Sequence, residues 1–207
     1  MFSKENDNIR TLDSLYKDIQ AGGYNLYLRH GEKDEGLGDK QGRPECIEQQ
    51  NLTENGINQS TEIGEIFRKQ KLLIQYPVFT SSYCRTKDTG KLAFGEQCEV
   101  LEELVKISSL RIENPVGETK RIKEKLIEKF ETIPDSNLNR VFVGHDYSFD
   151  QSRPNQGLGF LDIVILKPKG QGQGYEFIGI INFEQLKKMS SENSLNHICS
   201  ANLPESL

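Results

Sequence analysis

The run Tyr24–Leu28, followed directly by Arg29, His30 and Gly31, is the feature that most constrains the fold of this chain. Five residues without a charge are typical of a strand buried on both faces, and such strands occur in sheets that helices cover on both sides. The strand then ends in a cation, an imidazole and a glycine. At the carboxyl edge of an open α/β sheet, loops that bind ligands are held in place by the strands. We therefore expect a site at this edge.

The same pattern recurs twice. Arg140–Val143 predicts a second buried strand, which is followed by Gly144–Asp146 and so also ends in a histidine, His145. Pro77–Ser81 predicts a third strand, which runs into a helix that carries Arg85 near its start. Because the N-H groups and dipole of a helix N-terminus favour an anion, Arg85 is a second cation suited to an anion site at the same edge.

Apolar periodicity between these strands predicts one α/β domain over residues 1–207, with a core of about 24–182. The N-terminal helix and the tail from Asn182 are expected to be peripheral. Expected helices cover residues 8–21, 53–72, 82–94 and 118–131, and further strands cover 98–101, 161–166 and 175–181. The glycine-rich stretch 170–174 lacks the spacing of a dinucleotide-binding loop, so we interpret it as a hairpin connection.

Charge excludes several partners. Lys and Arg number 26 against 31 Asp and Glu, a net charge of -5, so no overall basic field attracts nucleic acid or an anionic membrane. The sequence contains no apolar run of about twenty residues, so no membrane-spanning helix is predicted. Residues 1–8 carry no export signal, which favours the cytoplasm for the sequence as it stands, or export if a signal was removed. The oligomeric state stays open.

Arg29, His30 and Gly31 together suit phosphoryl chemistry. A neutral imidazole is a competent nucleophile, and a guanidinium clamps a phosphoryl group with forked donors. Glycine lets a backbone N-H approach an anion. The alternative is a strand-end pair that only caps a loop. Four cysteines and three histidines lie too far apart for a recognisable zinc site, so no metal is expected.

The ordered set Arg29–Gly31, Ser81–Thr86 with Thr89, and Gly144–His145 resembles the histidine phosphatase superfamily, or phosphoglycerate mutase-like fold, over about residues 24–182. Gln50–Gly56 and Leu92–Gly95 look like a small bacterial branch of it. The resemblance implies a three-layer α/β/α sandwich with a mostly parallel sheet. It also implies a metal-independent phosphomonoesterase, without cofactor, that acts on a small-molecule phosphomonoester.

In the superfamily, the residue that matches His30 attacks phosphorus and carries the phosphoryl group. Those that match Arg29, Arg85 and His145 surround its oxygens. We expect these four residues to be catalytic, with further substrate contacts from Gly31, Lys33 and Ser82.

The resemblance leaves the proton donor open. One branch places a glutamate after the third strand, which matches Glu103 or its neighbour Glu102. The other places an aspartate after the second histidine, and Asp146 stands there. Asp162, at a strand start, is interpreted as a loop-capping group.

Two departures from the family pattern argue against mutase activity and against a large cap over the site. Glu32 and Lys33 follow the first motif and the chain has no Trp, which argues against mutase activity. The short stretch from Glu102 to Pro115 offers little material for a cap. Cys46 and Cys84 flank the two active-site motifs; a disulfide fits an exported protein, and unpaired thiols are the simpler interpretation. A pseudophosphatase, which binds phosphate without turnover, is the alternative function.

Overall fold

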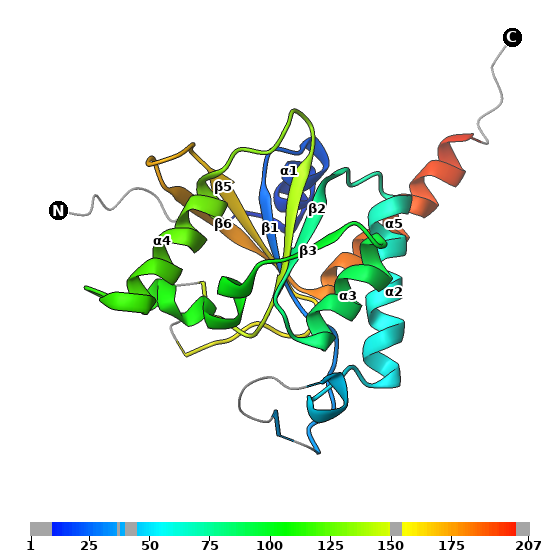
Figure 1. The fold of residues 1–207 in the computed structure, drawn as a ribbon. Coiled ribbons are helices and arrows are strands. Elements are labelled where there is room, and N and C mark those ends of the chain that lie inside the picture. Colours follow the sequence, from blue (N-terminus) through cyan, green and yellow to red (C-terminus); the bar gives the residue numbers. More distant parts are fainter. Residues whose placement is uncertain (1–9, 37, 40–44, 150–154, 202–207) are drawn as a thin grey trace, which may run out of the picture.

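The computed structural model describes residues 10–36, 38–39, 45–149 and 155–201, with side chains as far as Glu192. One mixed sheet of six strands crosses the molecule (Figure 1). In spatial order the strands are β3 (Cys98–Val100), β2 (Ile74–Thr80), β4 (Asn139–Gly144), β1 (Asn25–Arg29), β5 (Ile163–Pro168) and β6 (Tyr175–Ile181). The first four are parallel, and β5 runs antiparallel to both neighbours.

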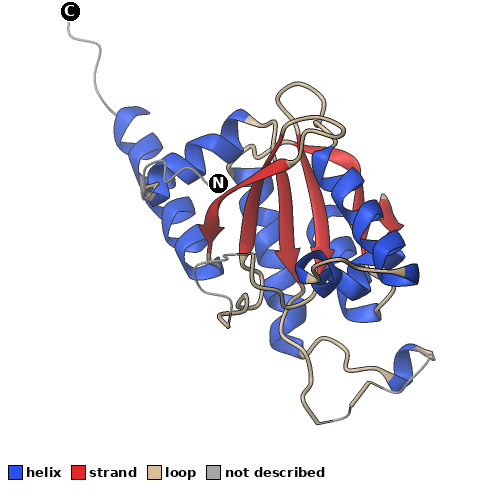
Figure 2. Cartoon of the chain, turned by 90° about the vertical axis from the view of Figure 1, so that its left-hand side faces the viewer, coloured by secondary structure: helices blue, strands red, loops and turns tan. Residues whose placement is uncertain are grey.

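Helices cover both faces of this sheet (Figures 1 and 2). One face carries α1 (Leu12–Ala21), α2 (Glu54–Lys69), α3 (Cys84–Phe94) and α5 (Phe183–Ala201). The other carries the 3-10 segment η2 (Glu102–Arg111) and α4 (Gly117–Glu131). A short 3-10 turn, η1 (Cys46–Glu48), lies in the long connection after β1. The expected three-layer α/β/α sandwich is confirmed.

Side-chain alternation along β1 explains the two layers. Leu26 and Leu28 pack into the cluster on the α1 side, whereas Tyr27 points to the α4 side. There its ring meets Phe130 edge-on, with centroids 6.3 Å apart. All of these side chains are essentially fully buried, and burying each large apolar side chain contributes roughly 1.5–3 kcal/mol. The sequence therefore fixes β1 in the middle of the core.

Strand register brings three strand ends to one level. Arg29 pairs with Gly144 across β1 and β4, and Thr80 pairs with Val143 across β2 and β4. Beyond the strands, the His30 N-H donates to the Gly144 carbonyl at 3.1 Å, and the Ser81 N-H donates to the Val143 carbonyl at 3.1 Å. His30, Ser81 and His145 thus leave the sheet side by side.

Both ends of the chain contribute more to the core than we expected. α1 buries Leu15, Tyr16 and Ile19, and α5 buries Leu186 and Met189 in the same cluster. The peripheral assignment was wrong because β5 and β6 extend the sheet, and their inner face requires this cover. No helix in the described part of the chain is both long enough and apolar enough to span a membrane.

Cys46 and Cys84 form a disulfide, with Cα atoms 5.7 Å apart. The expectation of unpaired thiols was therefore wrong for this pair. The disulfide forms because η1 packs closely on the first turn of α3. There the Gln49 side chain also accepts a hydrogen bond from the Cys84 N-H at 2.8 Å. The bond ties the connection after β1 to the helix that carries Arg85.

Removing this disulfide is expected to destabilise the fold. The bond joins residues 38 apart in sequence, and the chain-entropy model assigns about 4 kcal/mol to closing such a loop. Urea unfolding of Cys46→Ser should show a free energy of unfolding lower than that of the native protein by about 2–4 kcal/mol. Cys98→Ser, which removes a free thiol, is the control, and equal losses in both variants would contradict the prediction.

Candidate active site

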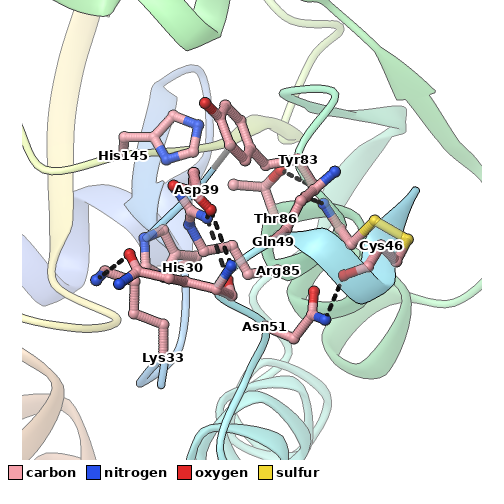
Figure 3. Close-up of polar contacts among 12 residues, drawn as sticks. His30, Lys33, Asp39, Cys46, Gln49, Asn51, Tyr83, Arg85, Thr86 and His145 are labelled. Carbon is pink, nitrogen blue, oxygen red and sulfur yellow. Dashed lines mark hydrogen bonds and ion pairs between the residues drawn. A yellow bond between two sulfur atoms is a disulfide. The ribbon is translucent and has the colours of Figure 1, made fainter. Parts of the chain in front are cut away.

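Two imidazoles face each other at the carboxyl edge of β1 and β4 (Figure 3). The rings of His30 and His145 lie 5.6 Å apart between centroids and nearly perpendicular. His30 is 2% exposed, whereas His145 is half-buried. Phe160 covers His30 from another side, with ring centroids 5.8 Å apart. The strand ends therefore bring together the two histidines that the sequence predicted at one site.

The hydrogen bond of His30 defines its reactive atom. Its Nδ1 lies 2.7 Å from the Gly31 carbonyl oxygen, which can only accept, so Nδ1 carries the proton and Nε2 keeps its lone pair. Burial is the main cause that lowers the pKa of His30 to about 2; electrostatic repulsion from His145, Arg85 and Arg29 acts in the same direction, and the hydrogen bond to Gly31 opposes it. His30 is consequently neutral and nucleophilic at Nε2, with two guanidiniums and a second imidazole within electrostatic range.

Tyr27 holds the backbone of His145. Its hydroxyl accepts the His145 N-H and donates to the His145 carbonyl, each at 2.8 Å. This arrangement explains Gly144, because a Cβ there would lie 2.2 Å from the Tyr27 hydroxyl oxygen. The glycine before the second histidine thus makes room for the side chain that positions that histidine.

Ser81 holds the ring of His145. Its Oγ lies 2.8 Å from His145 Nε2 and 2.8 Å from the Thr86 hydroxyl. Thr86 directs its own proton to a backbone carbonyl, that of Tyr83 at 2.7 Å or that of Ser81 at 3.0 Å. Ser81 then donates to Thr86 and accepts from His145, so Nε2 of His145 bears a proton. The Tyr83 ring packs against His145 at 5.0 Å.

Each arginine keeps an unused donor at the site. Arg29 stacks over Phe160 at 4.1 Å and donates from Nη1 to the Leu158 carbonyl. Arg85 is 6% exposed and stacks over Tyr83 at 4.3 Å. Within the described residues, the buried Nε of both arginines has no hydrogen-bond partner. Since buried donors are nearly always paired, these two are typical of a site that receives an anion.

The carboxylates near the site differ in their surroundings. Asp146 accepts the Leu158 N-H at 2.7 Å, and its charge raises the pKa of Arg29 against the larger effect of burial. Glu103 instead points to α4, where Arg121 donates to it at 2.9 Å. The neighbour of Glu103, Glu102, accepts the Ser82 hydroxyl at 2.7 Å. Glu103 is thus bound to α4, Glu102 is bound beside the second site motif, and Asp146 directly follows the second histidine. Which of the three donates a proton stays a prediction.

Asp162 has the capping role expected of it. Its carboxylate accepts the N-H groups of Gly159 at 2.7 Å and of Phe183 at 3.2 Å. Burial raises its pKa, and these two bonds and the charge of Arg29 oppose that shift.

The three further substrate-binding candidates, Gly31, Lys33 and Ser82, have partners within the protein. The Gly31 N-H donates to Thr89 at 3.0 Å, and a Cβ at Gly31 would lie 2.7 Å from the Gly56 carbonyl. This glycine serves close packing on α2, and its N-H already has a partner in the protein. Lys33 donates to the Gln50 side chain at 2.7 Å and pairs with Glu35, and Ser82 binds Glu102. Their part in substrate binding stays a prediction.

Structural comparison identifies the fold. The protein histidine phosphatase SixA in complex with tungstate aligns at 16% identity and TM-score 0.50, over 79% of this chain and 99% of that protein. This chain therefore shares its fold with that phosphatase. Mycobacterial hydrolase 1 aligns at 16% identity and TM-score 0.50, over 76% and 97% of the two chains. A mycobacterial glucosyl-3-phosphoglycerate phosphatase aligns at 17% identity and TM-score 0.48, over 75% and 97%. No protein-family model and no curated sequence matches the chain.

The sequence interpretation missed three residues of the site. Ser81 belonged to a quoted motif without a role, Tyr27 was counted only as core, and Asp39 was not singled out. Only the strand register shows that Tyr27 reaches His145, and Asp39 binds Arg85 across 46 residues of sequence. Among the described residues, no three His, Cys, Asp or Glu side chains gather in a geometry that holds a metal ion.

The low pKa of His30 predicts a pH-dependent stability. In the unfolded chain this residue takes up a proton below its ordinary pKa of 6.5, whereas the folded protein binds one only near 2. The free energy of unfolding should therefore fall as the pH drops below 6.5, by up to about 1.4 kcal/mol per pH unit from this residue. Urea titrations of the native protein and His30→Gln should show the shallower slope in the variant. Parallel slopes would contradict the low pKa.

Proposed function

We propose that this protein is a metal-independent phosphomonoesterase that works through a phosphohistidine at His30. The observation that carries the proposal is the set around His30: a neutral imidazole with a free Nε2 lone pair, two guanidiniums with unused buried donors, and a protonated Nε2 on His145. Positive groups around an uncharged nucleophile suit a dianionic phosphoryl group and its transition state.

The reaction divides into two displacements. His30 Nε2 gives its lone pair to phosphorus, and the bond from phosphorus to the ester oxygen breaks. Nδ1 keeps its proton and donates it in a hydrogen bond to the Gly31 carbonyl. This bond stabilises the positive charge that develops on the ring. Arg29 and Arg85 receive the equatorial oxygens. Water then attacks the phosphoryl group, the P-N bond breaks, and inorganic phosphate leaves with His30 neutral again.

Asp146 supplies the proton for the leaving group in this proposal. Protonated Asp146 gives its proton to the ester oxygen as the P-O bond breaks, and its carboxylate takes a proton from the attacking water in the second step. It is exposed at the edge of the site and follows His145 directly, so it can meet both the leaving group and solvent. Glu103, bound to Arg121 on α4, has neither advantage.

Hydrolysis of p-nitrophenyl phosphate tests the activity. The native protein should release p-nitrophenol in the presence of EDTA, and His30→Ala should abolish release. Arg85→Ala and Arg29→Ala should each lower kcat by roughly a hundredfold to a thousandfold, as expected for the loss of one preorganised donor. A phosphoprotein trapped by rapid denaturation should be labile to acid and stable to base. Phosphate binding without turnover would favour the pseudophosphatase instead.

The proton donor is tested by the choice of leaving group. Asp146→Asn should lower kcat by roughly a hundredfold or more for an alkyl phosphate, whose alkoxide needs a proton. The loss should be smaller for p-nitrophenyl phosphate, since p-nitrophenolate leaves without one. Glu103→Gln, which removes the carboxylate of the other candidate on η2, is the matched variant. It should change neither the rate for the alkyl phosphate nor that for p-nitrophenyl phosphate appreciably. A large loss in Glu103→Gln or in Glu102→Gln, with a small one in Asp146→Asn, would assign the donor to that glutamate.

A further inference from the structure

Asp39 binds Arg85 end-on (Figure 3). Nη1 of Arg85 donates to Oδ1 at 2.9 Å and Nη2 donates to Oδ2 at 3.1 Å. The Gln50 N-H donates to the same Oδ1 at 2.8 Å. Three donors thus hold one carboxylate beside the phosphoryl site, and none of the motifs in the sequence points to it.

The five N-H donors of the Arg85 guanidinium show which edge remains available. Both Nη1 protons are used, by Asp39 and by the Gln50 carbonyl at 3.1 Å, and one Nη2 proton is used by Asp39. The Nε proton has no partner among the described residues. It and the second Nη2 proton lie parallel on the side edge of the planar group, which is a fork that matches two oxygens of a phosphoryl group.

Backbone contacts and a nearby disulfide hold the residues around Asp39. The Gln50 backbone donates a hydrogen bond to Asp39 and accepts one from Arg85. The Gln50 side chain accepts a hydrogen bond from Lys33. The preceding turn is tied to α3 by the disulfide Cys46–Cys84, one residue before Arg85. The carboxylate therefore meets the guanidinium in one orientation set by the backbone.

The charge balance agrees with a permanent ion pair. Burial raises the pKa of Asp39, but the bonds from Arg85 and Gln50 and the charges of Arg85 and Lys33 outweigh it, so the pKa lies below its usual value. The carboxylate is thus ionised whenever the site is active. A buried arginine without this partner would retain its side-chain freedom and could turn its fork away from His30.

We propose that Asp39 is a positioning residue that holds the Nη1–Nη2 edge of Arg85 and thereby presents the Nε–Nη2 edge to the transferred phosphoryl group. The inference rests on the proposed function for its catalytic consequence. Asp39 itself contacts no reacting atom. It differs from an internal inhibitor, which would occupy the same donors that the substrate uses.

Asp39→Asn tests the proposal, because asparagine keeps the shape and loses the charge and one acceptor. We expect kcat for p-nitrophenyl phosphate to fall by roughly tenfold to a hundredfold, as for a misplaced catalytic group, with KM changed far less. Glu45→Gln, the same change of charge at an exposed carboxylate on this loop, should have native kinetics. An unchanged or raised kcat with a lower KM in Asp39→Asn would overturn the proposal, since it would make Asp39 a competitor of the substrate.

A double-mutant cycle shows whether Asp39 acts through Arg85. In an Arg85→Lys background the fork is absent, so Asp39→Asn should lower kcat less than about twofold, because coupled residues are non-additive. Full additivity would overturn the proposal. Calorimetric binding of tungstate to the native protein and Asp39→Asn gives a readout that needs no turnover. Weaker binding in the variant supports positioning even if the protein lacks phosphatase activity, and tighter binding contradicts it. Thermal unfolding of each variant verifies that it is folded.

Discussion

The parallel register of β1 and β4 is the constraint on which the rest of the site depends. Because Arg29 lies opposite Gly144, the next residue on each strand is a histidine, and both imidazoles leave the sheet at one level. The β2–β4 register adds Ser81 at the same level, on the ring of His145. A shift of one residue in either pair would turn one histidine to the opposite face of the sheet. The buried apolar alternation of these strands therefore determines the chemistry as well as the core.

The site concentrates positive charge, and the fold limits the free-energy cost of holding these charges close together. Aromatic rings cover the guanidiniums of Arg29 and Arg85, and carbonyls and one carboxylate take part of their donors. His30 contributes no charge, because burial and its neighbours keep it neutral. The buried Nε donors of both arginines have no partner within the described part of the chain. An anion that arrives there meets groups already oriented toward it, so little reorganisation remains for the reaction step.

Local sequence predicted the parts that depend on one segment. The strands and the placement of Arg29, His30 and His145 at strand ends follow from short patterns. The structure differed where distant segments meet. The cover of β5 and β6 by α1 and α5, the Cys46–Cys84 bond and the Asp39–Arg85 pair all depend on tertiary packing that no local period encodes. The close packing of Gly31 on α2 likewise depends on a distant segment.

The site thus has two halves of different origin. Strand ends supply the proposed nucleophile His30, the second imidazole and Arg29, and their geometry follows from the sheet. Arg85 stands on the first turn of α3, and its guanidinium is held by the connection after β1 through Gln50, Asp39 and a disulfide. A long, flexible cation gains precision only from such second contacts, because its own rotamers are many and close in energy.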